Sequence, residues 1–377
     1  VSEGDTHWTY ADLDRVSDSC ARRLHKTGVG NGTSLAVIAH ISRDTVALVY
    51  GALKLGAVVT LVSASAVEDT LEYMLSCADA ELIIVAAPQV RAGIRADRRA
   101  YSLDGTICPV LPEEDSDEAE YVRTCLGTDI DRSGIVLFTS GTTSRPKGIL
   151  LTQYRLLNNA NSHAAFFEAT PADRFVASLP IEHILGVIVT MLTPMMAGAA
   201  MCITRDIHTQ SILETIQRER CSVICGVPSM FHALVCKEDL QEYDVSSLRF
   251  GLTGGAFCSE ALFREAEEKL GIILISTLGQ TETTGGFTML DPRETPAQRH
   301  ASVGVPGFHM EVKIVDGEVC VRGYQVCDGY LKKPEATAEL IDPEGWLHTG
   351  DLGRFDENGL LYVMGRRKQI IIRSGEN

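Results

Sequence analysis

The sequence predicts an α/β fold of two Rossmann-like lobes with largely parallel sheets, followed by a small β-barrel-like subdomain. Strand patterns alternate with helical patterns along most of the chain, which is typical of parallel sheets packed against helices. After about residue 300 the pattern changes to short strand runs bounded by Gly and Asp, which indicates a barrel or a twisted sheet. The 377 residues have room for two to three domains, and 45% hydrophobic against 22% charged residues is ordinary for a globular protein.

The first lobe is expected over residues 1–133. Thr9 and Asp12 have the spacing of a capping box, and apolar residues then recur at helical intervals from Leu13 to Leu24. Strands are expected at 35–38, 58–62 and 82–85, and helices at 43–55 and 68–75. The acidic stretch 109–134 is interpreted as a solvated connector between the two lobes.

The second lobe is expected over residues 134–299, the β subdomain over 300–367, and a hinge with the start of a further domain over 368–377. Strands of the second lobe are expected at 135–138, 175–179, 223–225, 250–253 and 273–276. The segment from Ile184 to Ile203 has no charged residue and is long enough to cross a bilayer. Because Pro194 and Gly198 interrupt it, we predict a buried helix followed by a strand.

The charge and cysteine content exclude several classes of function. A net charge of −16 argues against nucleic acid or anionic membrane as a general partner. The eleven cysteines form no CxxC pair, and Cys221 and Cys225 lie in an apolar run. We interpret them as small buried hydrophobes in a reducing compartment rather than as metal ligands. With no signal-peptide pattern, a cytoplasmic location is expected; no pattern indicates the oligomeric state.

Hydroxyl, glycine and cationic residues are concentrated between Phe138 and Gly148. The stretch runs Thr139, Ser140, Gly141, Thr142, Thr143, Ser144, Arg145, Pro146, Lys147. Hydroxyls and exposed backbone N–H groups suit phosphate oxygens, and the lysine adds a point charge. It is not a Walker loop, because Gly-Lys is not followed by Ser or Thr and a second strand is expected at 149–151. Taken alone, the composition also suits a flexible linker.

The loop resembles the signature of the adenylate-forming superfamily, which includes acyl-CoA synthetases, luciferases and the adenylation domains of nonribosomal peptide synthetases. Other segments follow in the family's order. Residues 179–186 are similar to its acid-binding segment, 253–256 to the segment beside the adenine, and 278–282 to its Tyr-Gly-x-Thr-Glu motif. Residues 304–306, 323–331, 349–351 and 365–368 continue the series. The chain looks most similar to acyl-CoA synthetases.

The resemblance implies that the protein activates a carboxylic acid with ATP and Mg²⁺ and then forms a thioester with CoA. The implied nucleotide-binding residues are Thr139, Ser140, Gly141, Thr142, Thr143, Lys147, Gly255, Ala256, Leu278, Gly279, Thr281, Asp351 and Arg366. The implied catalytic residues are Thr142, Lys147, His183 and Glu282, with Glu282 and Thr142 as ligands of Mg²⁺. The implied acid pocket contains His183, Val187, Val227, Gly254 and Gly279, and Lys368 matches the hinge.

Each of these residues also has a structural interpretation. Glu282 could be an ordinary acidic residue at the start of a helix, Asp351 a turn residue after Gly350, and His183 a core histidine with a backbone partner. Two positions depart from the family pattern: Ser144 replaces a usual Gly, and Leu278 replaces the usual Tyr.

The expected substrate is a non-amino carboxylic acid, fatty or aryl. Residues 179–186 contain no Asp after an aromatic, which an amino-acid-selecting domain would use for the α-amino group. The chain ends at Asn377, where the family's small C-terminal domain would follow, so we expect it to bind nucleotide and acid but to turn over poorly alone. The alternatives are an adenylation domain that loads an acyl or amino acid onto a carrier protein, and a non-catalytic nucleotide-binding protein with a degenerate site.

Overall fold

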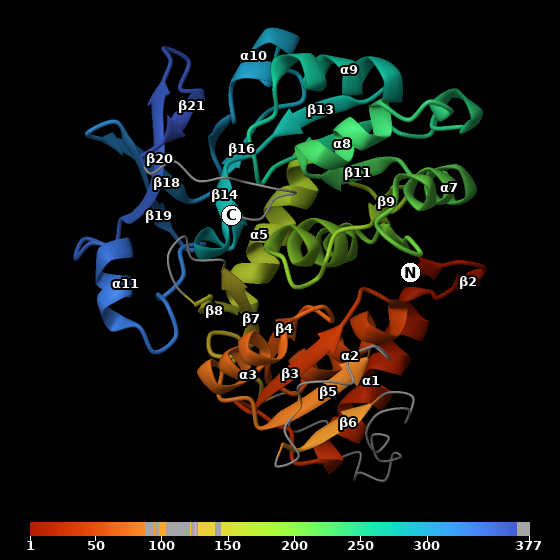
Figure 1. The fold of residues 1–377 in the computed structure, drawn as a ribbon, viewed down its shortest axis with the longest axis vertical. Helices are drawn as coiled ribbons and strands as arrows, with labels where there is room; N and C mark the ends of the chain where they lie inside the picture. The colour runs from red at the N-terminus through yellow and green to blue at the C-terminus, as the bar shows by residue number, and fades with distance from the viewer. Residues whose placement is uncertain are drawn as a thin grey trace. The chain divides into compact units, whose positions relative to one another are not determined.

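The computed structural model describes residues 1–86, 94, 98–102, 121, 125, 127–139 and 145–367. Two compact units can be distinguished (Figure 1). Unit 1 comprises residues 1–156, 180–182 and 330–332, and unit 2 comprises the other described residues. Most of the expected acidic connector lies outside the described residues.

The core of unit 1 is a six-stranded sheet with the order β6-β5-β3-β4-β7-β8. Its strands are β3 (Ser34–Ala39), β4 (Val58–Val62), β5 (Leu82–Ala86), β6 (Ala100–Ser102), β7 (Gly134–Thr139) and β8 (Lys147–Thr152). All neighbours are parallel except β7 and β8. A short hairpin of β1 (Ser2–Glu3) and β2 (Thr6–His7) lies at the start of the chain.

The predicted boundary between residues 133 and 134 falls inside unit 1. β7 and β8 were assigned to the second lobe, but β7 pairs in parallel with β4, so both strands extend the first sheet. The division between the units comes after Leu156, within helix α5 (Gln153–Phe166).

Three helices accompany this sheet: α1 (Tyr10–Lys26), α2 (Arg43–Lys54) and α3 (Glu68–Cys77). The predicted capping box is confirmed, since the Thr9 hydroxyl accepts from the Asp12 N–H and the Asp12 carboxylate accepts from the Thr9 N–H. α1 and α2 cross closely at Gly51, where an added Cβ would lie 2.5 Å from the Ser17 carbonyl oxygen. α3 packs on the sheet through Leu71, buried in a cluster with strand residues of β3, β4 and β5.

The core of unit 2 contains five parallel strands in the order β13-β12-β11-β9-β10. They are β9 (Arg174–Ala177), β10 (Ala200–Ile203), β11 (Val223–Gly226), β12 (Phe250–Thr253) and β13 (Ile273–Ser276). Numbered along the chain, the order is 2-1-3-4-5, the doubly wound arrangement in which ligands bind at the carboxyl ends of the strands. Helices α7 (Thr209–Glu219), α8 (Pro228–Val235) and α9 (Glu260–Leu270) connect the strands and bury Phe231 and Phe263 in one apolar cluster (Figure 1).

The uncharged segment before β10 is helical and buried, as predicted. A π-helix (Gly186–Leu192) continues into α6 (Thr193–Ala197), which ends at Gly198 with φ of 66°. Among the described residues, no helix combines the length and the apolar character needed to cross a membrane. Cys221 and Cys225 are buried thiols, in agreement with their interpretation as small hydrophobes.

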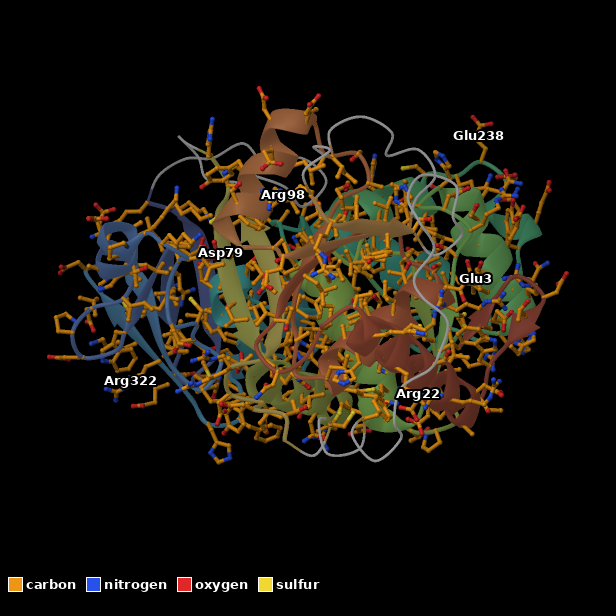
Figure 2. All side chains as sticks on the ribbon, turned by 90° about the horizontal axis from the view of Figure 1, so that it is seen from below. Glu3, Arg22, Asp79, Arg98, Glu238 and Arg322 are labelled. Atoms are coloured by element: carbon orange, nitrogen blue, oxygen red, sulfur yellow. The ribbon has the colours of Figure 1, made fainter. Side chains whose placement is uncertain are left out.

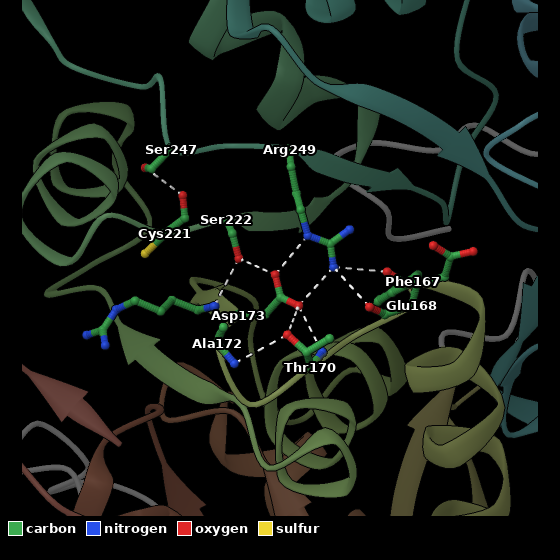
Figure 3. A network of polar contacts seen from close by, with 10 residues as sticks. Phe167, Glu168, Thr170, Ala172, Asp173, Cys221, Ser222, Ser247 and Arg249 are labelled. Carbon is green, nitrogen blue, oxygen red and sulfur yellow. Dashed lines mark hydrogen bonds and ion pairs between the residues drawn. The ribbon is translucent and has the colours of Figure 1, made fainter.

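A buried carboxylate fastens the beginnings of three of these strands (Figure 3). Asp173, just before β9, accepts hydrogen bonds from Ser222 before β11 (2.7 Å) and from Arg249 Nε before β12 (2.8 Å). Arg249 also donates to the Phe167 carbonyl, and the Thr170 N–H donates to the carboxylate. Burial opposes ionisation of Asp173, but these hydrogen bonds outweigh it and lower its pKa to about 2.

The end of the described chain forms a four-stranded antiparallel sheet in the order β18-β19-β20-β21. Its strands are β18 (Met310–Val315), β19 (Glu318–Gly323), β20 (Leu347–Phe355) and β21 (Leu361–Arg366), with α10 (Pro296–Ala301) before them and α11 (Pro334–Leu340) between β19 and β20. This is the small β subdomain expected from the sequence. It belongs to unit 2, and its core residues Val319, Val321 and Leu347 pack with Phe287. Charged side chains such as Glu238 and Arg322 lie at the periphery (Figure 2).

Candidate active site

The predicted functional segments of unit 2 follow the carboxyl ends of its parallel strands. His183 comes after β9, Val227 directly after β11, and Gly254 directly after β12. Leu278 and Gly279 come after β13. Because the carboxyl ends of parallel strands lie on one edge of a sheet, the fold brings to one edge segments that are about 100 residues apart in sequence.

His183, a residue of the predicted acid pocket, lies at the start of the helical segment that contains the π-helix. Its Nδ1 accepts the Leu185 N–H at 3.2 Å, and its carbonyl accepts the Val187 N–H at 3.1 Å. An imidazole whose Nδ1 accepts a hydrogen bond carries its proton on Nε2 when neutral. His183 is half-buried, whereas Val187 is fully buried. π-turns inside helices are frequent at functional sites because they widen the helix locally.

Two glycines bring this helical segment close to the neighbouring loops. A Cβ added to Gly254 would lie 3.4 Å from Thr277 and 3.9 Å from Leu185. A Cβ added to Gly285 would lie 3.4 Å from Ile184 and 3.6 Å from Ile188. The other nearest neighbours are polar: Asn159 Nδ2 at 3.4 Å from the Gly285 Cβ and the Thr277 carbonyl oxygen at 3.8 Å from the Gly254 Cβ. The surroundings of these two glycines are therefore a mixture of aliphatic carbons and uncharged polar groups.

A tight hairpin after β13 contains the predicted magnesium ligand. β14 (Gly279–Gln280) pairs with β15 (Gly285–Gly286) around a 3₁₀ turn, Thr281–Thr283. A Cβ on Gly279 would lie 2.3 Å from the Gly285 carbonyl oxygen, so the hairpin requires glycine there. The Glu282 carbonyl accepts the Cys327 N–H at 2.9 Å, which fixes the backbone of the turn.

The hairpin also contains a strained residue, Thr284, whose φ is 55°. A β-branched residue in this region costs about 1–3 kcal/mol. Its hydroxyl donates to the Gln325 carbonyl at 2.6 Å, and its carbonyl accepts from the Asn159 side chain. The surrounding structure therefore holds this turn in a conformation that the local sequence does not favour.

The predicted ribose ligands Asp351 and Arg366 form an ion pair. They are opposite each other on β20 and β21, with Arg366 Nε 2.6 Å from Asp351 Oδ1. Gln280 of the hairpin donates to Asp351 Oδ2 at 3.2 Å and to the Thr349 carbonyl at 2.7 Å. This glutamine joins Asp351, the predicted ribose ligand, to the turn that contains Glu282.

The buried surroundings of the Asp351 carboxylate disfavour its negative charge. Only 2% of the residue is exposed, and this burial raises its pKa, although Arg366 and Gln280 act in the opposite direction. A carboxylate whose pKa is raised by burial beside a specific charged partner is a candidate functional group.

The flanks of the phosphate loop lie in unit 1. Thr139 ends β7 and Lys147 begins β8, and the two residues are paired across the hairpin. The predicted strand–loop–strand arrangement is therefore present, in contrast to the strand–loop–helix of a Walker loop. Lys147 Nζ lies 4.3 Å from the centre of the Tyr330 ring, and the Leu331 N–H donates to the Gly148 carbonyl at 2.8 Å.

The remaining predicted residues have varied surroundings. Gly255 is exposed after β12, with φ of 78°, and Ala256 is half-buried. Leu278, where the family has a tyrosine, is partly buried against the apolar cluster around Phe287. Thr281 begins the 3₁₀ turn. Ser140, Gly141, Thr142, Thr143, Ser144 and Lys368 lie outside the described residues.

The sequence analysis did not identify Gln280 or Tyr330 as site residues. Both lie inside motif segments of the sequence, 278–282 and 323–331. The motifs did not indicate which residues these two side chains contact. The Gln280 contacts reach residues about 70 positions away, and local spacing contains no information about such contacts.

The chain is similar to a large group of known enzymes. A family model described as "AMP-binding enzyme" matches residues 1–331. YngI of Bacillus subtilis, whose name assigns it to the acyl-CoA synthetases, is 30% identical over 98% of this chain and 76% of its own length.

Two solved structures are also similar. o-Succinylbenzoate CoA synthetase of Bacillus subtilis, bound to a product analogue, has a TM-score of 0.85 and 26% identity, over 99% of this chain and 76% of that one. ATP-bound MatB of Rhodopseudomonas palustris has a TM-score of 0.81 and 25% identity, over 97% and 75%.

The family match covers the phosphate-loop flanks, the hairpin and most of the strand ends described above, and the relatives agree in being CoA ligases or synthetases. The resemblance seen in the sequence motifs is thereby confirmed. The chain belongs to the family of AMP-binding enzymes.

Proposed function

We propose that this protein activates a non-amino carboxylic acid, fatty or aryl, as an acyl-adenylate and transfers the acyl group to CoA. The observation that carries the proposal is the contact of Gln280 with Asp351, which joins the proposed ribose carboxylate to the hairpin of Glu282. The CoA-ligase relatives support the acceptor. The atoms nearest to Gly254 and Gly285 include no carboxylate that could pair with an ammonium group, which supports an acid without an amino group.

The first step joins two anions, so the protein must orient them and offset their charge. A carboxylate oxygen of the acid forms a bond to the α-phosphorus of ATP, and the bond to the leaving pyrophosphate breaks. In the second step the CoA sulfur, having lost its proton, attacks the acyl carbon, and AMP leaves.

Each group of residues would have one part in this chemistry. Asp351 would accept hydrogen bonds from the ribose hydroxyls, with Arg366 beside it. Lys147 and Thr139 would contact the outgoing phosphates. His183, with its proton on Nε2, would donate toward the acid carboxylate.

The turn Thr281–Thr283 suits Mg²⁺. It offers the Glu282 carboxylate and the Thr281 hydroxyl, the kind of oxygen ligands that this hard cation prefers. The Thr283 hydroxyl is buried and hydrogen-bonded to the backbone of Gln280 and Gly285, so it holds the turn instead. Glu282 would hold the ion, which when bound offsets phosphate charge. The role of the protein is to fix the turn, through the Cys327 N–H and the Thr284 contacts.

The test is pyrophosphate release from ATP–Mg²⁺ over a panel of fatty, aryl and amino acids, with hydroxylamine added to trap the acyl-adenylate. We expect hydroxamate from fatty or aryl acids only, and its loss in Glu282→Gln. Glu357→Gln, an exposed residue between β20 and β21, serves as the matched control. A clear preference for amino acids, or no acyl-adenylate with any acid despite ATP binding, would overturn the proposal.

The acceptor is tested separately with CoA against a phosphopantetheinyl carrier protein. Thioester formation on CoA is the expected result. Transfer only to the carrier would replace the second half of the proposal and leave the first intact.

A further inference from the structure

Three side chains with metal-ligand chemistry meet on the four-stranded sheet of unit 2. Glu318 and Cys320 alternate along β19, so both point to one face. His348 on β20 is the direct cross-strand partner of Cys320. One ligand atom from each of the three lies within 4.8 Å of the others.

The spacing of these atoms suits a tetrahedral ion. Cys320 Sγ lies 3.6 Å from His348 Nδ1, and His348 Nδ1 lies 3.1 Å from Glu318 Oε2. Zinc binds sulfur at about 2.3 Å and nitrogen or oxygen at about 2.0–2.2 Å, which places ligand atoms of a tetrahedron about 3.2–3.6 Å apart. The Sγ–Nδ1 separation lies within this range and the Nδ1–Oε2 separation is about 0.1 Å below it, and all three ligand atoms lie within 4.8 Å of one another.

The strands hold the ligands in place before any ion binds. Glu318 and Cys320 are buried, at 4% and 0% exposed, whereas His348 is only half-buried and leaves a path from solvent. The second imidazole nitrogen, Nε2, lies 3.9 Å from the Asp342 carboxylate. Asp342 is itself fixed by the N–H groups of Glu344 and Trp346, both at 2.9 Å. A carboxylate behind a histidine ligand is the usual outer-shell partner at zinc sites.

The local charges allow a dication. Glu318 accepts the Gly350 N–H on Oε1 and Arg367 Nη1 on Oε2, both at 2.9 Å. The ion would bind the lone pair of Glu318 Oε2 that faces His348 Nδ1, in place of a proton between these two atoms. The Arg367 N–H would keep its hydrogen bond to the other lone pair of Oε2. The ion with one carboxylate and one thiolate is neutral, and the positive charge of Arg367 is offset by Asp342.

We propose that Glu318, Cys320 and His348 Nδ1 form a zinc-binding site, with water in the fourth position. A thiolate and an imidazole select zinc over magnesium, because both are softer ligands than oxygen. Binding forms the Zn–S bond and releases the Cys320 proton to solvent. Glu318, one of the three ligands, also accepts the N–H of Gly350, which directly precedes Asp351 in the chain. The ion would therefore stiffen the backbone at the proposed ribose site.

Burial raises the pKa of the Cys320 thiol, with Glu318 adding to the rise. Lys313 and Arg367 lower it, and Asp342 raises it further.

The test uses Co²⁺ as a spectroscopic probe on the chelator-treated 377-residue chain. We expect one equivalent to give intense visible d–d bands and a near-ultraviolet thiolate-to-cobalt band, both abolished by one equivalent of Zn²⁺. Cys320→Ser should lose the thiolate band, and Asp342→Asn should weaken zinc binding ten- to a hundredfold. Cys327→Ser, another buried thiol in the same unit, is the matched control and should keep the band.

No thiolate band in the wild-type chain, or an unchanged band in Cys320→Ser, would overturn the proposal. If Cys320→Ser does not fold, His348→Gln at the half-buried position gives the same test, and retention of full zinc affinity there would refute the site. Because the readout is metal binding, it is independent of whether the chain forms an acyl-adenylate.

Discussion

At the scale of single residues, Asp351 is a carboxylate whose surroundings disfavour its charge. Its pKa is raised by burial, so the folded protein holds the ionised form at a cost in stability. Asp173, whose hydrogen bonds outweigh the effect of burial, shows the opposite shift.

Asp351→Asn should therefore separate stability from binding. The amide no longer has to be ionised in a buried place, so we expect the free energy of unfolding to be unchanged or raised. Nucleotide binding should weaken by about 1.5–3 kcal/mol, or ten- to a hundredfold, because a charge-assisted hydrogen bond is lost. Calorimetry with ATP and chemical denaturation measure the two quantities. Asp316→Asn, in the turn between β18 and β19, is the control; unaltered ATP affinity in the Asp351 variant would exclude the ribose role.

The residue types at the site could be predicted, but their contacts could not. Asp351, Arg366 and Glu282 were identified because each stands in a recognisable motif, and the structure pairs the first two. Gln280 connects Asp351 to the hairpin that contains Glu282, through contacts that depend on the packing of β14 against β20. Contacts between residues so far apart in the chain produce no periodic pattern in the sequence.

At the scale of elements, the hairpin β14–β15 is the most constrained piece of the site. Gly279 faces Gly286 across two strands of two residues each, and the turn between them includes the strained Thr284. The hairpin was not expected from the sequence, because its strands are too short for a strand pattern.

Gly279→Ala is expected to disrupt this hairpin. The new Cβ would meet the Gly285 carbonyl at 2.3 Å, which is backbone and cannot rotate away. We expect a loss of about 1–3 kcal/mol of stability and a nucleotide affinity at least tenfold weaker, measured by thermal unfolding and ATP titration. Gly30→Ala is the matched control, since an added Cβ there would meet nothing within 4 Å and its φ lies outside the left-handed region. Equal ATP affinity in the two variants would contradict this account of the hairpin.

Most longer elements were predicted within about two residues. Helices such as α1 have one apolar face and therefore a clear period, whereas the parallel strands are buried on both faces and form continuous apolar runs. The assignment of β7 and β8 to the second lobe was different. Their strand character was read correctly, but the choice of sheet depends on the pairing of β7 with β4, more than 70 residues earlier. The π-helix was likewise read only as a helix, since a single wide turn hardly changes the apolar pattern.

At the scale of the whole molecule, the α/β class followed directly from the alternation of patterns, and the family match and related structures confirm it. The sequence did not predict that the β subdomain belongs to the same compact unit as the second sheet. That grouping depends on Phe287 and its neighbours, which form one apolar cluster with β19, β20 and β21.

Acid stability is a property of the whole molecule to which Asp173 should contribute measurably. Its pKa is about 2 when folded and near 3.8 when unfolded. The ionised carboxylate therefore adds about 2 kcal/mol above pH 4, and this is lost as the pH falls toward 2. Asp173→Asn should lower the free energy of unfolding at pH 7 and make it less steep between pH 4 and pH 2, as measured by urea denaturation at each pH. A variant with the full acid slope would show that the network in Figure 3 does not provide this stability.

The parallel order of the second sheet has a consequence for how enzymes of this kind diversify. Each loop at the carboxyl edge is attached to its own strand, and three of the strands, β9, β11 and β12, begin at a shared anchor, Asp173, at the opposite end. Between β9 and the π-helix, Ile184 lies against Gly285 of the hairpin after β13 and Leu185 lies near Gly254. Exchanges in this loop that keep Ile184 and Leu185 should therefore leave the hairpin undisturbed. A library that shuffles only that loop should change which acid is chosen and leave the use of ATP as it was.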